Sequence, residues 1–316
     1  MSAPRLELPN LDPDAIRDPI QPADPHARNS PWLSRGLLLP ALIFAIILTQ
    51  IPFIVTIVYS TLQWNLLKPA DFGFTGIDNY LTVFRSGDLI PSIIATVLIT
   101  ALSVTFALLF GMLFAVLLDR KFKGRAIART LVITPFLLMP AAAALIWKYS
   151  MFDTSIGVIN YVVTSLGLPP IEWSTDYPLW TVVAVLTWQF TPFMMLILLA
   201  GLQSQGRDIL EAASVDGAGP LKTFAFITLP HLRTYIEIAV LLGTIIIIQV
   251  FDPVAIMTKG TGGTKTLAYL LYERAFIGLN VGEAAAYGVV SVLLTIIVAM
   301  IALRTLFKVF ISGVER

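Results

Sequence analysis

The chain has 316 residues, of which 57% are hydrophobic and 13% are charged. A soluble domain carries roughly twice that share of charged residues. The formal net charge is +1, which excludes a strongly basic nucleic-acid-binding surface extending over the whole chain. With no cysteine and two histidines, the sequence also excludes disulfides, thiolate nucleophiles, cysteine-based metal sites and multi-histidine metal sites.

Residues 1–35 are the first predicted unit, a disordered cytoplasmic tail. Seven prolines and five acidic residues fall within residues 1–31, which have no apolar core and therefore lack the pattern of a signal peptide. A segment of this composition cannot bury enough surface to offset the entropy that ordering costs. A short docking motif within the tail is the alternative interpretation.

The apolar residues that follow are grouped in blocks long enough to cross a bilayer. A helix needs about 20 apolar residues to span the hydrocarbon core, and lipid forces backbone that crosses it to be helical. We predict an all-α membrane protein in which residues 36–311 form one domain of six transmembrane helices. The predicted spans are residues 37–62, 91–118, 131–147, 179–202, 236–250 and 284–303, with kinks expected at Pro52, Pro135, Pro140 and Pro192.

The distribution of lysine and arginine predicts the orientation of these spans. Of the 21 Lys and Arg residues, 15 fall in the two tails and in the connections 119–130 and 203–234. Basic residues favour the cytoplasmic side of a membrane. The sequence therefore predicts a multi-pass membrane protein with both termini in the cytoplasm. The outer connections, 63–90, 150–178 and 251–283, are too short for a large folded domain.

The most informative connection is the cytoplasmic loop at about residues 204–232, which predicts a helix, a turn and a second helix. Asp208 is the expected N-cap of the first helix, with Glu211 three positions later as in a capping box. The pair Asp216-Gly217 predicts the turn, and Gly217 is expected to take a positive φ.

The second helix of this loop is expected to start at Pro220, because proline suits the first turn of a helix. Phe224 and Ile227 give the helix an apolar side, and Phe226 is a third candidate for that side. Pro230 is expected to end the helix before the next span. The predicted result is a compact helical element that protrudes from the membrane and fits a groove on another protein.

The same loop carries a recognisable pattern. The order Glu-Ala-Ala, three residues, Gly, nine residues, Ile-x-Leu-Pro resembles the coupling-loop signature of ABC importer permeases. The matching positions are Glu211, Ala212, Ala213, Gly217, Ile227, Leu229 and Pro230. An ordinary amphipathic loop helix is the alternative interpretation of this stretch.

Further segments resemble the carbohydrate-uptake, maltose-type branch of that family, and the similarity runs from about residue 36 to the C-terminus. These segments are residues 74–80, 124–130, 188–193 and 257–260. Two features depart from the branch. The Gly-Gly-Pro that often follows the last segment is replaced by Gly-Thr-Gly-Gly-Thr at residues 260–264, and the large outer domain of some maltose-type subunits is missing.

The resemblance implies a type I ABC importer permease of the bacterial cytoplasmic membrane that works with a second permease subunit, two ATPase subunits and an extracellular substrate-binding protein. ATP and Mg would bind in the ATPase subunits, and no cofactor is expected in this chain. Residues 260–266 lack the glycine spacing of a phosphate loop, so the chain is not expected to be an enzyme. The resemblance assigns Glu211 to contact with the ATPase, whereas Asp216 either caps the second helix or makes a similar contact.

The predicted substrate pathway rests on side chains that suit a sugar. Sugars are bound by aromatic faces and a few polar groups in mostly apolar pockets. Gln189, Phe190 and Phe193 can share one helix face, and Gln249 and Asp252 lie at the outer end of the fifth span. Packing for the phenylalanines and interhelical hydrogen bonds for the glutamines are the alternatives.

The function predicted from these features is translocation of a sugar or polyol delivered by an extracellular binding protein and driven by ATP. A secondary carrier or channel that works without ATPases is the alternative. An intramembrane enzyme is disfavoured, because the predicted spans carry no convergent set of His, Asp and Glu residues. Sugars, sugar alcohols and glycerol phosphates remain open as substrates, and the lack of a buried Arg or Lys pair favours neutral ones.

Overall fold

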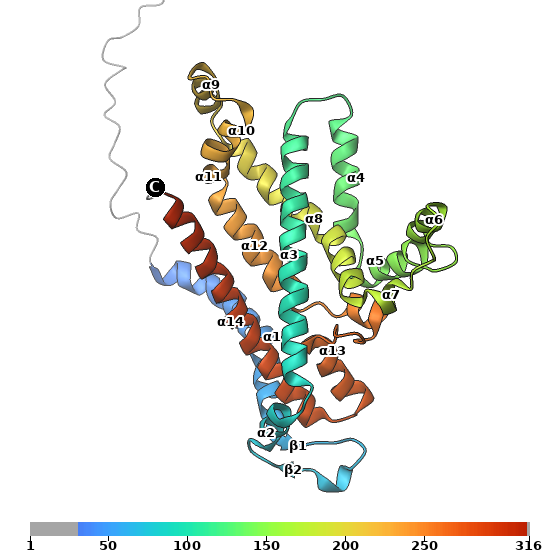
Figure 1. The fold of residues 1–316 in the computed structure, drawn as a ribbon. Coiled ribbons are helices and arrows are strands. Elements are labelled where there is room, and N and C mark those ends of the chain that lie inside the picture. The colour runs from blue at the N-terminus through green and yellow to red at the C-terminus, as the bar shows by residue number, and fades with distance from the viewer. Residues whose placement is uncertain (1–30, 315–316) are drawn as a thin grey trace, which may run out of the picture. The chain divides into compact units, whose positions relative to one another are not determined.

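The computed structural model describes residues 31–314, and most of them are helical (Figure 1). The chain divides into two compact units, Met1–Val55 and Thr56–Arg316. Helix α1 (Pro31–Ser60) begins in the first unit. Residues 31–35, whose composition predicts a tail, therefore belong to a helix, and the rest of the predicted tail lies outside the described residues.

Four of the described helices are long and apolar enough to cross a membrane, or six if each of two bent pairs is one span. The continuous ones are α1, α3 (Leu89–Asp119), α8 (Pro178–Ser204) and α14 (Val281–Val314). In the first bent pair, α4 (Arg125–Leu137) is followed by α5 (Pro140–Ile146) and the π-helical η2 (Trp147–Met151). In the second, a segment made of α10 (Pro220–Thr223), η3 (Phe224–Thr228) and α11 (Leu229–His231) is followed by α12 (Arg233–Ile247). The predicted all-α membrane architecture is confirmed.

A proline lies at or just before each bend. Pro140 opens α5 and has no amide hydrogen to donate back into α4, and Met139 before it takes an extended backbone with φ −60° and ψ 137°. The kink expected there is a full break, with an angle of 105° between the two helices. The second bend, of 62°, follows Pro230, where the helix was expected to end. Pro52 and Pro192 lie inside α1 and α8, which continue past them.

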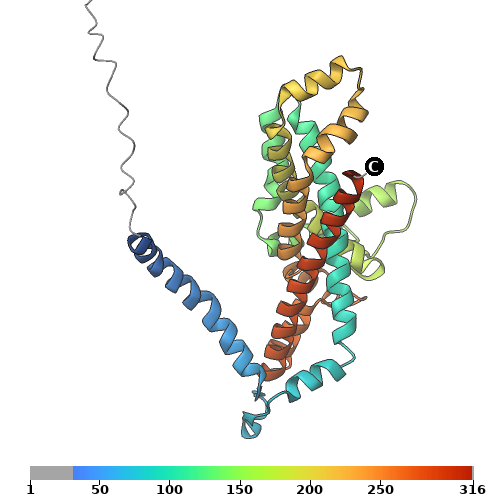
Figure 2. The same cartoon turned by 90° about the vertical axis from the view of Figure 1, so that its left-hand side faces the viewer.

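The core of the second unit is built on α3, which lies along α8, with α12 against both (Figures 1 and 2). Close approach depends on small residues in α3. A Cβ atom on Gly111 would lie 2.7 Å from Met194 Cβ, so only glycine fits at this crossing. Val104, Leu186 and Met194 belong to the buried cluster that fills the space between these helices.

Short elements form the connections at the two ends of the helices. At one end β1 (Leu62–Gln63) pairs antiparallel with β2 (Gly73–Phe74), and α2 (Asp78–Arg85) follows. At the opposite end α9 (Arg207–Val215) projects beyond α3 and α4, and α10 follows it (Figures 1 and 2). The other short elements are η1 (Pro69–Asp71), α6 (Val158–Ser165), α7 (Trp173–Asp176), η4 (Val254–Thr258), α13 (Leu267–Tyr272) and η5 (Glu273–Ile277).

The glycine-rich segment 260–266 is a tight turn that leads into α13. Thr264 is fully buried, and its hydroxyl lies 2.6 Å from that of Thr258. Thr266 is the N-cap of α13, and its side chain accepts a hydrogen bond from the Tyr269 amide at 3.3 Å. The threonines of this segment therefore stabilise the turn itself.

Candidate functional site

The predicted coupling loop begins with α9, and its start differs from the expectation. Gly206, with an extended backbone at φ −63° and ψ 133°, is the N-cap, and no side chain caps the helix. Asp208 therefore lies within the first turn, where its negative charge still interacts favourably with the positive end of the helix dipole. The capping box predicted from Asp208 and Glu211 is wrong, because glycine takes the cap position two residues earlier.

The turn after α9 matches its prediction. Gly217 has a φ of +78°, and Asp216 before it is the C-cap of α9. The Ala218 amide donates to the Ala213 carbonyl at 2.9 Å, and the Gly217 amide donates to the Ser214 carbonyl at 3.2 Å. These two bonds form a Schellman motif, which needs a left-handed residue where Gly217 stands.

The second helical segment starts at Pro220, as predicted, and its N-cap is Gly219. Asp216 therefore does not cap this helix, and of its two predicted roles the contact with a partner stays a prediction. Phe224 and Ile227 are half-buried on the expected apolar side, whereas Phe226 is 77% exposed and lies on the other side.

The eight predicted coupling residues divide by exposure. The exposed ones are Glu211, Ala212, Asp216, Gly217 and Pro230; Ile227 and Leu229 are half-buried, and Ala213 is buried. Among residues 31–314, no hydrogen bond or ion pair is made by the carboxylates of Glu211 and Asp216. Both acidic groups are therefore available to a partner.

Large apolar side chains are exposed beside these carboxylates. We call Ile209, Val215, Leu221 and Phe226 the loop surface; they are 51%, 86%, 85% and 77% exposed, respectively. Exposed apolar side chains at such a density indicate a binding surface. The charged residues Arg207, Asp208 and Lys222 lie among them, so the surface suits a protein partner better than lipid.

The base of the loop is held between α8 and α12 by a polar clamp. Tyr235 donates to the Ser204 hydroxyl at 3.0 Å, and the same hydroxyl lies 3.1 Å from His231 Nε2. That nitrogen also lies 3.2 Å from the Gly201 carbonyl oxygen. Leu232 is fully buried beneath this clamp. The loop is thus attached rigidly to two spans.

Three of the five predicted pathway residues lie together on α8 and contact the broken third span. The Gln189 amide donates to the Leu138 carbonyl at 3.0 Å, where the break leaves that carbonyl without a helical partner. Phe193 stacks on Phe136 with ring centroids 5.4 Å apart, and Phe190 meets the same ring at 6.2 Å. The shared helix face that their spacing predicts is confirmed, and it packs against residues 136–138.

The other two predicted pathway residues lie beyond the end of α12. Gln249 is exposed, and its amide donates to the Ile245 carbonyl at 3.0 Å. Asp252 is half-buried. Neither is brought into contact with Gln189 by the described interactions. Within residues 31–314, no group of three or more His, Cys, Asp and Glu residues is placed to hold a metal ion.

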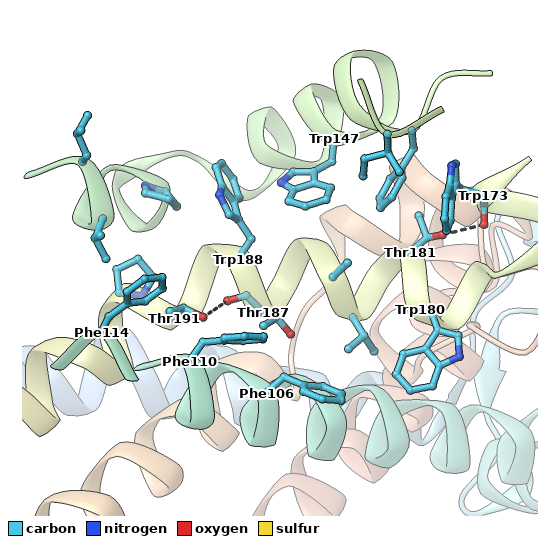
Figure 3. Close-up of a pocket in the computed structure, with 18 residues that line it drawn as sticks. Phe106, Phe110, Phe114, Trp147, Trp173, Trp180, Thr181, Thr187, Trp188 and Thr191 are labelled. Atoms are coloured by element: carbon cyan, nitrogen blue, oxygen red, sulfur yellow. Dashed lines mark hydrogen bonds between the residues drawn. The ribbon is translucent and has the colours of Figure 1, made fainter. Parts of the chain in front are cut away.

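A cavity of about 710 Å³ lies on a different face of α8 (Figure 3). Phe106, Phe110 and Phe114 line it from α3, and Trp147 and Trp188 lie across from them. None of the five predicted pathway residues lines this cavity. The phenylalanines recur every four residues, so their shared face could have been identified from the sequence.

Residues 107–316 match the protein family described as binding-protein-dependent transport system inner membrane component. The chain belongs to this family. The match includes the loop at residues 204–232, so the resemblance predicted from the coupling-loop motif is confirmed. This permease chain is therefore a subunit of an ABC importer rather than a secondary carrier or channel.

Individual relatives are also permease proteins. The permease is 35% identical over 274 residues to a probable ABC transporter permease protein of Sinorhizobium fredii, covering 85% of this chain and 88% of the relative. It is 32% identical to the trehalose/maltose transport system permease protein MalF of Thermococcus litoralis, with coverage of 81% and 88%. Since these relatives are permease proteins, the prediction that this subunit is not an enzyme is confirmed.

Solved structures support the fold. The permease superposes with a TM-score of 0.73 on a chain of a bacterial ABC transporter involved in the import of alginate, at 22% identity, covering 88% of this chain and 96% of the other. The predicted type I permease fold is thus confirmed. The spans and the family together make the permease a multi-pass membrane protein with the partners of an ABC transporter in general.

Proposed function

We propose that this permease imports a sugar or polyol delivered by an extracellular binding protein, and that the loop surface receives the motion of an ATPase. The Thermococcus litoralis relative is named for trehalose and maltose, which supports a carbohydrate. The observation that carries the coupling role is the exposed, rigid loop at residues 207–226, with its free carboxylates and apolar side chains.

The proposed contact with the ATPase combines an apolar interaction with polar pairing at its rim. Val215 and Leu221 enter an apolar groove, and the burial of two such side chains supplies about 1.5–3 kcal/mol each. Glu211 and Asp216 pair with basic or hydrogen-bonding groups at the rim, which fixes the register of the contact. The exposed Ala212 keeps the partner-facing side of α9 narrow enough for close approach, and the buried Ala213 lets α9 pack closely on its own chain.

The clamp at the base carries the motion into the membrane. Because Ser204, His231 and Tyr235 join the end of α8 to the start of α12, a displacement of the loop moves both spans together. Gln189, Phe190 and Phe193 tie α8 to the break between α4 and α5. These three side chains, with Gln249 and Asp252 at the far end of α12, are the proposed substrate pathway.

The complete transporter contains a second permease subunit, two ATPase subunits that bind ATP and Mg, and the binding protein. The loop lies at the same end of the helices as the basic connection 119–130 (Figure 1). Positive residues favour the cytoplasmic side, so this end faces the cytoplasm of a bacterial cell, where ATP is available, and both termini lie there too. Residues 36–311 form the transmembrane domain.

Uptake measured in proteoliposomes tests this proposal. The permease is reconstituted with its partners, and uptake of labelled trehalose or maltose is followed with the binding protein outside and ATP inside. We expect uptake that requires ATP and the binding protein and is unaffected by ionophores. Uptake driven by an ion gradient without ATP would contradict the proposal. If ATP drives uptake of another solute only, the carbohydrate assignment is wrong and the coupling role stands.

A further inference from the structure

Exposed tyrosine and tryptophan side chains are concentrated in one part of the described chain. Tyr149, Tyr161, Tyr177 and Trp180 are 55%, 73%, 48% and 51% exposed, whereas the other exposed Phe, Tyr and Trp residues within residues 39–301 are all phenylalanines. Tyrosine and tryptophan gather at the boundary between lipid and water, where an apolar ring meets a polar tip.

Two of these aromatic positions mark the ends of spans. Tyr149 lies in η2, at the end of the broken third span, and Trp180 lies in the first turn of α8, which is the fourth span. Both span ends therefore carry the residues expected at the membrane surface. The connection that joins them, residues 152–177, starts and ends at this depth.

The middle of this connection has the composition of a lipid-facing segment. We call residues 156–171 the elbow; the 16 residues contain no Asp, Glu, Lys, Arg or His. Val158, Tyr161, Val162 and Ser165 recur at helical spacing along the outward face of α6, and the first three are 54%, 73% and 52% exposed. Ile156, Leu166 and Leu168 are also more than half exposed.

The elbow is rigid, so its apolar face is held outward. Asn160, on the inner side of α6, is 1% exposed. Its amide donates to the Ile171 carbonyl at 2.9 Å and to the Asp153 carbonyl at 3.1 Å, and its carbonyl oxygen accepts from the Ile171 amide at 3.0 Å and from Trp173 Nε1 at 3.2 Å. These bonds close the loop across both ends of the elbow.

Charged groups border the elbow on both sides. Asp153 precedes it, and Glu172 follows it directly. The backbone amides of Ile156 and Ser155 donate to the Asp153 carboxylate and lower its pKa, so this group stays ionised at neutral pH. An ionised carboxylate stays in water. The charge-free stretch between the two acidic residues is thus bounded by groups that mark the aqueous side.

We propose that the elbow lies in the lipid headgroup–acyl boundary and anchors the turn between the third and fourth spans to the membrane surface. Water does not suit this face, because it would leave six large apolar side chains hydrated. A bilayer boundary accepts the apolar residues, the Tyr161 hydroxyl and the flanking carboxylates at one depth. The proposal needs only that the chain spans a membrane, and it stands apart from the substrate and coupling proposed above.

Spin labels on single cysteines test this placement. The chain contains no cysteine, so Tyr161→Cys and Val162→Cys each give one label site, and the complex with the unmodified chain gives the background from partner subunits. The complete transporter is reconstituted in lipid vesicles, and collisions with oxygen, which enters lipid, are compared with collisions with a water-soluble nickel chelate. The control is Thr175→Cys, on the exposed side of α7 beside Asp176.

The proposal expects oxygen to reach the labels at positions 161 and 162 more readily than the nickel chelate, with the reverse preference at position 175. Greater access of the nickel chelate at 161 and 162 would place the elbow in water and overturn the proposal. Exclusion of both reagents at these positions would show that another protein subunit covers the elbow, which would also overturn it.

Discussion

The turn at Gly217 offers a sharp test, because a matched glycine lies two residues away. Gly217 has a φ of +78°, whereas Gly219 has a φ of −68° and a ψ of 163°; nothing lies within 4 Å of a Cβ built on either. The Cβ of a new side chain at either position therefore meets no steric neighbour. The two variants differ only in the backbone conformation that the new residue must take.

Only Gly217→Thr is expected to lose conformational free energy of the turn. A residue with a side chain pays about 1–2 kcal/mol for a left-handed backbone, and a β-branched residue is strongly disfavoured there. Threonine is an accepted N-cap with an extended backbone, so Gly219→Thr should be close to neutral. A cost of 1–2 kcal/mol lowers the fraction of loops with the native turn relative to an altered one by roughly 5–30-fold.

The assay compares uptake per reconstituted transporter for both variants. We expect Gly217→Thr to lower uptake severalfold while the protein still inserts into the membrane, and Gly219→Thr to keep the unmodified rate. Uptake at the unmodified rate by both variants would refute the role of this turn. An equal loss in both would show that the loop tolerates no substitution and that the positive φ is not the cause.

The remaining predictions concern the contacts beneath the loop. Gly201→Val would bring a Cβ to 2.6 Å from the Tyr235 ring and 2.7 Å from Leu232 Cδ2, so the melting temperature of the purified transporter should fall by an amount corresponding to about 1–3 kcal/mol; an unchanged value would contradict the close packing. Tyr235→Phe removes the bond to Ser204 and should cost about 0.5–1.5 kcal/mol in the same assay. Gln189→Leu leaves the Leu138 carbonyl at the helix break without its donor, and we expect a loss of about 1 kcal/mol and altered uptake; full stability with unaltered uptake would argue against this tie.

The parts of the coupling loop that depend on local sequence were predictable. Gly217 follows an Asp and precedes a Gly-Pro pair, and this local chemistry is enough to predict the turn and the start at Pro220. The N-cap was predicted wrongly because Asp208 has a better capping side chain than Gly206. The backbone is extended at Gly206, so α9 begins at Arg207 and the cap lies two residues before Asp208. Tertiary geometry overrode the local preference.

Contacts between distant segments were not predictable from hydropathy. The bond from Gln189 joins residues 51 positions apart, and its acceptor is free only because α4 and α5 break at Pro140. Hydropathy could not distinguish the faces of α8, because 72% of the most apolar stretch of this helix is buried and apolar residues therefore occur on nearly every side. The structure places the cavity on the face of α8 that carries Trp188, whereas the predicted pathway residues of α8 lie on a different face.

Cross-linking from the loop surface tests the central claim most directly. Val215→Cys, at a position 86% exposed on α9, is modified with a photoreactive cross-linker in the complete transporter, and Thr175→Cys is the control at the other end of the helices. We predict that the probe at position 215 joins the ATPase subunit and that the probe at 175 does not. No cross-link to the ATPase from position 215, with the ATPase present and active in the complex, would contradict the account.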